Sequence, residues 1–558
     1  MRKSFKSFCK KRLSISCYLL VAIFLLQTQK VSAQKDTTKQ QTITITSAYK
    51  PVLRTAAKTN FSGSNLTADT SKNLLPYNIP VQNLFYSYQP ITLKPLALQH
   101  DTLVQMGMRY FAKVGFGNYS TPYINAGASF GDGVTSILNV FGNYISSKGK
   151  IKNQDYSNFS IKGTGSYFLP NNELYASAEL NRRQYSLYGY DHAIHEYNKD
   201  DIRHRFQEIE LVTGFRNTSK NNFNFDYNPN IKINFFGGKD SLSETSLQLN
   251  LPAEKKISDL FSIKFNGIID LTHYKTKNGT PDTSFNNNII QLNPAIFYRT
   301  DLFKINGGVN SIMNNGKWIF MPNVFGEMAL GQQKFIIQAG WIGKINKNTY
   351  RNLSYINPYI KTLDAQKNTL ETEIYGGIKS SIGKHILFTA KAGFIKYKDY
   401  QFILNDTASA SDGKSFVLST EPKLNNFRLH GDLSYIIQDK FNLTGAVTFN
   451  GFAGMKVNER AWNTIPVEFN ASARWNLNKK LLLKSEFYFF AGGHYLEKGN
   501  LSRTFNGATD WSVGGEYKIK KQFSAFIDLN NIFGKNYERW HNYPVYGMNV
   551  LGGICLRF

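Results

Sequence analysis

From about residue 104 to its end, the chain repeats one pattern: runs of roughly ten to fifteen residues in which apolar and polar side chains alternate, separated by short polar turns. Runs such as "RYFAKVGFGN", "FQEIELVTGFRN" and "DWSVGGEYKI" place side chains of opposite character on the two faces of a strand. Turns such as "LNKK", "QDK" and "IGK" join neighbouring runs directly, which predicts antiparallel hairpins in up-and-down order. No helix-period segment of useful length interrupts the pattern, so we predict an all-β protein.

The number of runs indicates whether the sheet is open or closed into a barrel. It is roughly twenty, and we predict an even strand number between about 16 and 22. An open antiparallel sheet of that size exposes two unpaired edges, whereas closure removes both and is the only way for a sheet to satisfy its backbone within a membrane. A large soluble sandwich or propeller accommodates the alternation but does not explain strands of this length. We therefore predict a transmembrane antiparallel up-and-down β-barrel over residues 104–558.

The last run is apolar on one face up to the final residue. Every second position contributes to this face, namely Tyr546, Met548, Val550, Gly552, Ile554, Leu556 and Phe558. Aromatic residues make up 14% of the chain, although its mean hydropathy is only −0.35. This combination is typical of strands whose outer side chains meet lipid and whose inner side chains meet water, with aromatic girdles at the interfaces.

The first 33 residues have the features of a signal peptide. A basic stretch, "MRKSFKSFCKKRLSIS", precedes the apolar run "CYLLVAIFLL" and the small-residue site "VSA", so we expect the mature chain to begin at Gln34. An uncleaved anchor is the alternative, while lipidation is not favoured because Cys17 stands before the apolar run. Without the leader, Cys555 is the only cysteine and no intrachain disulfide can form.

The chain is strongly basic. Its formal charge is +27, or about +20 without the seven basic residues of the leader. Phosphate-bearing lipid head groups and acidic glycans are expected partners for this charge in the cell envelope. Nucleic acid is not expected there. The alternative is that the lysines solvate turns and a barrel lumen, since the charges are spread along the chain.

Residues 34–103 do not show the repeated alternation of the rest of the chain. The polar tether "QKDTTKQQ" is followed by the β-branched run "TITITSAYKP" and by the proline-punctuated stretch "NLLPYNIPVQNLFYSYQPITLKPLALQ". We expect a short extended periplasmic segment that lies inside the barrel, pairs with another protein or rests against the periplasmic rim. In "TITIT", Thr42, Thr44 and Thr46 share one face and Ile43 and Ile45 the other, so its backbone can pair with a partner edge.

The C-terminal stretch "LNNIFGKNYERWHNYPVYGMNVLGGICLRF" resembles the ending of TonB-dependent receptors of the bacterial outer membrane. The residues that carry the resemblance are Asn531, Ile532, Phe533, Tyr537, Tyr543, Pro544, Gly547 and Phe558. In outer-membrane barrels, the alternating strand with a terminal aromatic is read by the barrel-assembly machinery. The resemblance implies this role for Tyr546, Met548, Val550, Ile554, Leu556 and Phe558.

Two further stretches are similar to the same family. "INPYIKTLDAQKNTLETEIYGGIKSSIG" is like a receptor hairpin in which an Asn-Pro-Tyr loop precedes a strand; the matching residues are Asn357, Pro358, Tyr359, Glu371 and Gly377. Residues Thr42, Ile43, Thr44, Ile45 and Thr46 look like the segment with which such receptors pair with the TonB protein. The chain departs from the family in one respect, because residues 34–103 are too short for its plug domain of well over a hundred residues. The lumen is then closed by residues 34–103, by inward-folded loops or by a partner.

The sequence contains few residues arranged as in a metal-binding or catalytic site. One stretch, "YDHAIHEYNKDDIRH", contains several side chains that could bind a metal ion: His192, His195, His204, Asp191 and Glu196. They can do so only if the loop folds back on itself, and their spacing along the sequence does not favour a metal site. No histidine stands in a nucleophile motif, so we expect neither an enzyme nor a cofactor.

Two functions are left open. The first is passage or gating of a solute across the outer membrane. The second is a non-enzymatic accessory or scaffold subunit of an outer-membrane complex, such as one for envelope assembly or secretion, held through its N-terminal segment. The expected partners are outer-membrane lipid, the barrel-assembly machinery and TonB or other envelope proteins, with no nucleic acid.

Overall fold

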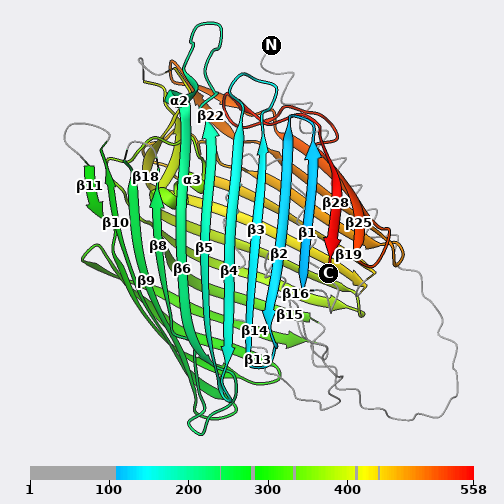
Figure 1. The fold of residues 1–558 in the computed structure, drawn as a ribbon. Helices are drawn as coiled ribbons and strands as arrows, with labels where there is room; N and C mark the ends of the chain where they lie inside the picture. Colours follow the sequence, from blue (N-terminus) through cyan, green and yellow to red (C-terminus); the bar gives the residue numbers. More distant parts are fainter. Residues whose placement is uncertain (1–108, 239–240, 278–282, 331–334, 409–411, 438–439) are drawn as a thin grey trace, which may run out of the picture. The chain divides into compact units, whose positions relative to one another are not determined.

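The computed structural model describes residues 109–238, 241–277, 283–330, 335–408, 412–437 and 440–558. Within these ranges, 22 strands form one closed antiparallel barrel whose first and last strands pair (Figure 1). The fold class predicted from the alternation is confirmed, with the strand number at the upper limit of the predicted range. The predicted signal peptide (1–33) and N-terminal segment (34–103), and with them any statement about a plug, lie outside the described residues.

The strands of the barrel wall are β1 (Tyr110–Gly117), β2 (Thr121–Gly131), β3 (Ser136–Ser147), β4 (Tyr156–Phe168), β5 (Asn172–Ser186), β6 (Arg203–Asn217), β8 (Asn230–Gly237), β9 (Ser243–Lys256), β10 (Phe261–Thr276), β12 (Ile289–Arg299), β13 (Phe303–Asn314), β14 (Lys317–Leu330), β15 (Phe335–Asn346), β16 (Thr369–Ile382), β17 (Ile386–Asn405), β18 (Phe416–Ile437), β19 (Phe441–Ala453), β20 (Val467–Asn476), β21 (Leu481–Ala491), β24 (Ala508–Lys518), β25 (Phe523–Asn530) and β28 (Asn549–Arg557).

Shorter elements lie in the connections: β7 (Phe225–Tyr227), β11 (Thr283–Asn286), the hairpin of β22 (His494–Glu497) and β23 (Leu501–Thr504), the pair β26 (Glu538–Trp540) and β27 (Tyr543–Pro544), and the helices α2 (Lys199–Ile202) and α3 (Tyr350–Ile356). No helix among the described residues is both long enough and apolar enough to cross a bilayer.

Alternation along the strands separates an apolar outer face from a polar inner face. On β16, Ile374 and Ile378 are exposed, whereas Glu371 and Glu373, at positions of the opposite parity, are buried. An outward apolar face is the one that lipid covers. The same pattern on β28 exposes Ile554, Leu556 and Phe558, as expected for the last strand.

Tyr546 departs from the predicted outward row of the last strand. It precedes β28, is only 7% exposed, and its hydroxyl donates to the backbone oxygen of Gln154 at 2.6 Å. Met548 also precedes the strand but is exposed. The period of two holds only where the backbone is paired, and here pairing begins at Asn549.

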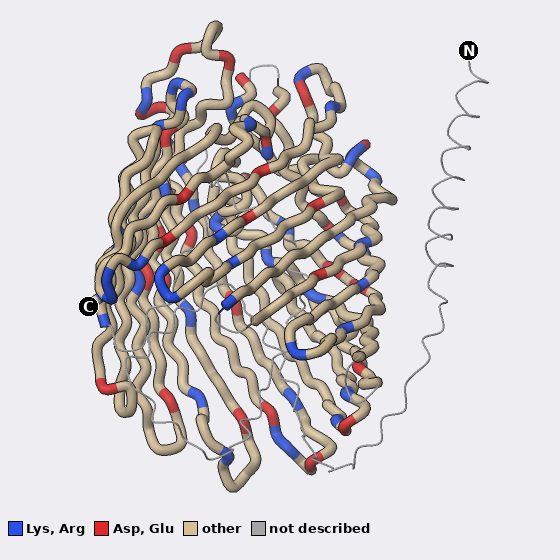
Figure 2. Tube along the Cα trace, turned by 90° about the vertical axis from the view of Figure 1, so that its right-hand side faces the viewer, with Lys and Arg blue, Asp and Glu red and all other residues tan. Residues whose placement is uncertain are grey.

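Charged side chains of the wall pair with one another on the inner face. Figure 2 shows lysine, arginine and carboxylate residues along the strands as well as in the loops. Lys391 contacts Glu373 at 3.0 Å, Lys379 contacts Glu327 at 2.6 Å, and Arg557 contacts Glu516 at 2.6 Å. Part of the basic charge therefore lines the inside of the barrel.

The two ends of the barrel differ. At the end where β1 begins and β28 ends, here called the turn end, the connections have three or four residues apart from residues 218–229. At the opposite end, here called the loop end, connections reach 187–202, 347–368 and 531–548. In outer-membrane barrels short turns face the periplasm and long loops face outward.

Candidate functional site

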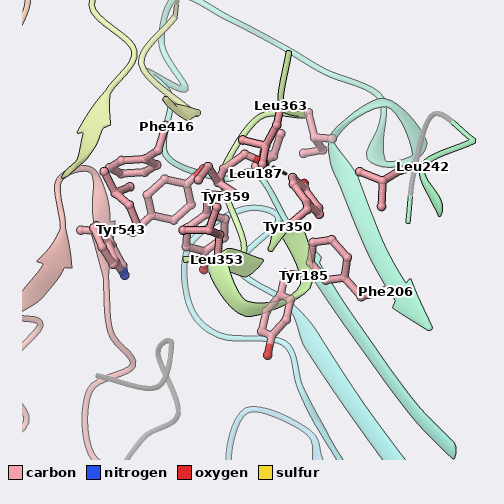
Figure 3. Close-up of a cluster of buried hydrophobic side chains, with 14 of the residues drawn as sticks. Tyr185, Leu187, Phe206, Leu242, Tyr350, Leu353, Tyr359, Leu363, Phe416 and Tyr543 are labelled. Atoms are coloured by element: carbon pink, nitrogen blue, oxygen red, sulfur yellow. Dashed lines mark hydrogen bonds between the residues drawn. The ribbon is translucent and has the colours of Figure 1, made fainter. Parts of the chain in front are cut away.

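At the loop end, several connections fold inward and pack an apolar cluster across the mouth of the barrel (Figure 3). We call these connections, residues 187–202, 347–368 and 531–548, the lid. The buried cluster contains Tyr185, Leu187, Tyr188, Tyr190, Ile202, Phe206, Phe236, Leu242, Tyr274, Tyr350, Leu353, Tyr359, Ile360, Leu363, Ile403, Phe416, Trp540 and Tyr543. Its members come from strands on both sides of the mouth, β5 to β10 on one and β17 to β18 on the other.

The centre of the lid is a stack of two tyrosines from distant connections. The rings of Tyr359 and Tyr543 lie 3.6 Å apart at an angle of 17°, and both side chains are essentially inaccessible. Tyr188 meets Tyr543 edge to face at 4.8 Å, and Phe416 lies 5.9 Å from the same ring. Such aromatic pairs each contribute about 0.5–1.5 kcal/mol beyond the area that they bury.

Three hydroxyl groups of this cluster donate to backbone oxygens. Tyr188 donates to the backbone oxygen of Pro544 at 2.9 Å, Tyr350 donates to that of Ile360 at 3.1 Å, and Tyr543 donates to that of Lys414. Burial raises the pKa of both Tyr359 and Tyr543 well above the ordinary tyrosine value. The shift reflects how strongly the apolar surroundings disfavour a charged phenolate in this cluster.

Backbone contacts also tie the lid to the wall strand β18. Lys361 donates its backbone N–H to the oxygen of Phe416 at 2.8 Å, and Phe416 donates to that of Tyr359 at 3.1 Å. In the connection 187–202, Gly189 lies against the ring of Tyr543, where an added Cβ would approach ring carbons to 2.3 Å. A glycine is therefore required for this close approach.

Helix α3 carries the middle of the lid. It begins after Thr349, whose hydroxyl accepts the N–H of Asn352 at 3.1 Å, and Glu244 of β9 accepts the N–H of Tyr350 at 2.7 Å. It ends at Asn357, whose side-chain oxygen accepts the N–H of Tyr359 at 2.8 Å. The Asn-Pro-Tyr stretch thus turns the chain so that Tyr359 meets Tyr543.

One side of α3 is attached to the wall by charged groups, here called the latch. Arg351 contacts Glu208 of β6 at 2.8 Å and Glu210 at 3.7 Å, and the hydroxyl of Tyr355 donates to Glu208 at 2.6 Å. The guanidinium of Arg183 lies 3.5 Å from the centre of the Tyr355 ring. The apolar cluster and the latch together hold the lid in the mouth.

The weak metal candidates are not brought together. The Nε2 atom of His192 lies 3.1 Å from the backbone oxygen of Tyr188, His195 stacks on Tyr197, and the Nδ1 atom of His204 lies 3.3 Å from the oxygen of Pro358. The described residues contain no group of three or more His, Cys, Asp or Glu side chains that could hold a metal ion. The predicted TonB-contacting strand, residues 42–46, lies outside the described residues.

The structure unites two stretches that the sequence singled out separately. Tyr359 comes from the Asn-Pro-Tyr stretch and Tyr543 from the C-terminal stretch, and their contact forms the centre of the lid. Sequence reasoning did not identify the latch or Gly189. The tyrosine-rich stretch at 185–190 was the available signal, but the aromatic surplus was attributed to interface girdles.

No family model and no curated protein matches this chain. Solved structures match its fold. They include the FrpB iron transporter from Neisseria meningitidis, with 11% identity, 82% of each chain covered and a TM-score of 0.63. The siderophore receptor PirA from Acinetobacter baumannii has 10% identity, covering 81% of this chain and 80% of its own, with a TM-score of 0.63. The ferric enterobactin receptor PfeA from Pseudomonas aeruginosa has 12% identity, the same coverages and a TM-score of 0.59.

These structures share a 22-strand barrel with the present chain, at identities that show the fold alone. The described chain combines that barrel with an apolar outer face, short turns at one end and long loops at the other. The chain is therefore a bacterial outer-membrane β-barrel with the fold of TonB-dependent receptors.

Proposed function

We propose that the barrel passes a solute across the outer membrane and that the lid is its gate. The observation that carries the proposal is the buried cluster made by connections rather than by the wall, centred on Tyr359 and Tyr543. Long connections in a barrel with no gating role can remain in solvent. Here they bury apolar side chains across the mouth, an arrangement that blocks passage until the lid moves.

Net charge and the similar structures support one class of solute to test first. The printed names of the neighbours describe an iron transporter and receptors for siderophores. The present chain has a large net positive charge, and such a charge attracts anionic solutes to the protein. Anionic metal chelates are therefore the first class to test for uptake.

Gating can be tested by conductance in planar lipid bilayers. We would compare the intact protein with a variant lacking residues 34–103, a variant in which residues 349–366 are replaced by a short Gly–Ser turn, and a variant with both changes. The loop replacement removes α3 and Tyr359 but leaves β15 and β16 intact. The doubly changed barrel is expected to conduct ions steadily, while the variant lacking only residues 34–103 stays closed because its lid remains.

The matched control shortens a connection that contributes nothing to the apolar cluster. Replacing residues 497–502, the tip of the β22–β23 hairpin, by the same turn should leave conductance low, because Tyr495, which stacks on His541 of the lid, is kept. High conductance after removal of residues 34–103 alone would show that the lid does not close the barrel. That result would assign closure to the N-terminal segment.

Energised opening is the second part of the proposal, with residues 42–46 as the strand that TonB pairs with. Proline lacks a backbone N–H, so Thr44→Pro interrupts strand addition without altering the barrel. Uptake of a radiolabelled ferric chelate should fall about ten-fold or more, on the basis that several backbone hydrogen bonds of roughly 1 kcal/mol are lost. Thr37→Pro, in the polar tether, is the control, and equal uptake by both variants would contradict a role for this strand.

A subunit role is the second candidate, and one feature of the turn end favours it. Residues 218–229 form the longest described connection at that end, and Phe223 within it is 75% exposed. Phe225 in the same connection is also exposed, and exposed apolar side chains that gather on a surface mark protein or membrane contacts. Mass analysis of the native protein extracted in mild detergent, with a tag in the β22–β23 hairpin, separates the candidates: stoichiometric recovery with other envelope proteins indicates a subunit, and recovery alone excludes one.

A further inference from the structure

An open groove with a volume of about 510 Å³ crosses the outer surface of the barrel from β4 to β9. Its wall toward the turn end consists of side chains that face lipid, including Leu180, Ile209 and Phe235. Its wall toward the loop end includes Arg182 and Gln207. Phe159 also lines the groove, opposite Arg182, so the groove is mainly apolar at one end and carries polar groups beside an aromatic ring at the other.

The strand register explains this division. Leu180 lies opposite Ile209, and Ile209 lies opposite Phe235, so one transverse row of outward side chains is apolar. One row closer to the loop end, Arg182 lies opposite Gln207, which lies opposite Gly237. Because Gly237 has no side chain, the polar row is interrupted there, which helps to leave the groove open.

A second guanidinium stands beside the first. Arg205 is exposed in the next row toward the loop end, opposite Gln184, whose Oε1 atom lies 3.5 Å from one of its guanidinium nitrogens. Arg182 and Arg205 are diagonal neighbours on the outer face. Neither forms an ion pair with any residue in the described part of the chain, so two guanidinium groups stand uncompensated where the apolar surface ends.

We propose that this groove binds a phosphate-bearing lipid of the outer leaflet. An acyl chain lies along Leu180, Ile209 and Phe235, and the phosphate is held by Arg182 and Arg205. Guanidinium groups bind phosphate through paired, charge-assisted hydrogen bonds. The site is separate from the lid and goes beyond the transport function.

The position of the groove selects a lipid over other anions. A free phosphate would contact the two arginines but would gain nothing from the apolar wall. A protein partner would require about 800 Å² of buried surface on each side for a stable interface, with its contacts partly inside the bilayer. A lipid uses both walls, and its phosphate lies at the level where the apolar outer face gives way to polar residues.

The test is native mass spectrometry of the full chain in a mild detergent, titrated with dioleoyl phosphatidic acid. Dioleoyl phosphatidylcholine is the net-neutral lipid for comparison, and inorganic phosphate is the lipid-free probe. Phosphatidic acid is expected to be retained in preference to phosphatidylcholine. In the double variant Arg182→Ala/Arg205→Ala its apparent affinity should fall about ten-fold or more, because the phosphate loses both of its charge-assisted contacts.

Two further variants separate a built site from general attraction. Lys396 and Lys398 are also exposed on the outer face, beyond Phe394 on β17, so Lys396→Ala/Lys398→Ala removes the same charge away from this groove. Gly237→Leu fills the groove without changing charge; the added Cβ meets only the backbone oxygen of Leu242, at 3.7 Å. Unheated gel migration verifies that each variant is folded.

The proposal predicts loss of binding in the arginine double variant and in Gly237→Leu, and near-normal binding in the lysine double variant. Equal losses in the arginine and lysine variants would overturn it in favour of unspecific surface attraction. Unchanged binding in Gly237→Leu would also overturn it, since the groove would then have no part. Displacement of the lipid by equimolar inorganic phosphate would show a simple anion site and would overturn it as well.

Discussion

Replacing Gly553 by valine is expected to prevent stable closure of the barrel. Gly553 of β28 lies opposite Gly115 of β1, at the seam where the last strand meets the first. A Cβ atom at Gly553 would lie 2.1 Å from the backbone oxygen of Val114 and 2.6 Å from the Cα of Gly115. These are backbone atoms, so relief requires the two strands to separate. We expect a loss of about 3 kcal/mol or more in the free energy of unfolding.

The aromatic ring of Phe526 covers this seam from inside the barrel. An added Cβ at Gly553 would approach the ring to 2.7 Å, and Lys113 lies 3.7 Å from the ring centre on the same face. The substitution therefore meets both strands and the ring that packs over them. Refolding into lipid vesicles, followed by unheated gel migration and urea unfolding, measures the effect.

The adjacent glycine supplies the control. An added Cβ at Gly552 meets nothing closer than the backbone oxygen of Phe526, at 3.8 Å. Gly552→Val should therefore refold nearly as the parent does, because this position is on the opposite, outer face of the strand. Equal defects in the two valine variants would show that the seam does not require Gly553 specifically.

The same assays distinguish closure from recognition by the assembly machinery. We predict that Phe558→Glu lowers the amount of folded barrel in cells but leaves refolding of the purified protein nearly unchanged, because an assembly signal acts only where the machinery is present. Gly553→Val should lower both. Normal insertion of Phe558→Glu in cells would refute the proposed signal.

Replacing Arg351 by alanine is expected to release α3 from the wall. The carboxylate of Glu208, with its side chain only 8% exposed, would lose its partner at 2.8 Å and remain among buried groups. Removing one partner of a buried ion pair costs about 3–5 kcal/mol. Amide hydrogen exchange of residues 350–363 should therefore become faster, while exchange of the wall strands stays slow.

A double-mutant cycle identifies the unpaired charge as the cause. Adding Glu208→Gln to Arg351→Ala removes the charge that was left behind, so exchange of residues 350–363 should slow again in part. The ion pair of Lys152 and Glu196 is as short, at 2.6 Å, but both side chains are largely exposed. Lys152→Ala should have little measurable effect. Faster exchange that Glu208→Gln fails to reduce would mean that Arg351 acts through packing alone.

Gly553 and Arg351 lie in different parts of the barrel. The seam determines whether the wall closes, whereas the latch determines whether the lid remains in the mouth of a closed wall. Under the proposed gating, Arg351→Ala should raise conductance in the variant that lacks residues 34–103, and Gly552→Val should not. This outcome would connect the stability of the lid to passage through the barrel.

The strands could be predicted because their signal is local. Each strand has one face toward lipid and one toward the interior, so alternation at Ile374 and Glu373, or at Ile554 and Arg557, is already present in a short window of sequence. The even strand number and the closed topology follow from backbone pairing. The outward apolar row predicted for the end of the chain is present from Ile554 to Phe558. The prediction was wrong for Tyr546, because periodicity alone does not show at which residue the strand begins to pair with its neighbours.

The lid could not be predicted in the same way. Tyr359 and Tyr543 are far apart in the sequence, and nothing near either residue indicates that they stack. The sequence allows closure by inward-folded loops as one of three alternatives, and it does not indicate the latch between Arg351 and Glu208. By itself, the sequence determined an outer-membrane barrel, because strand alternation depends only on the two solvents that each strand meets. Only the tertiary structure decided that the mouth is covered, because loop packing depends on which distant side chains the closed barrel brings within contact.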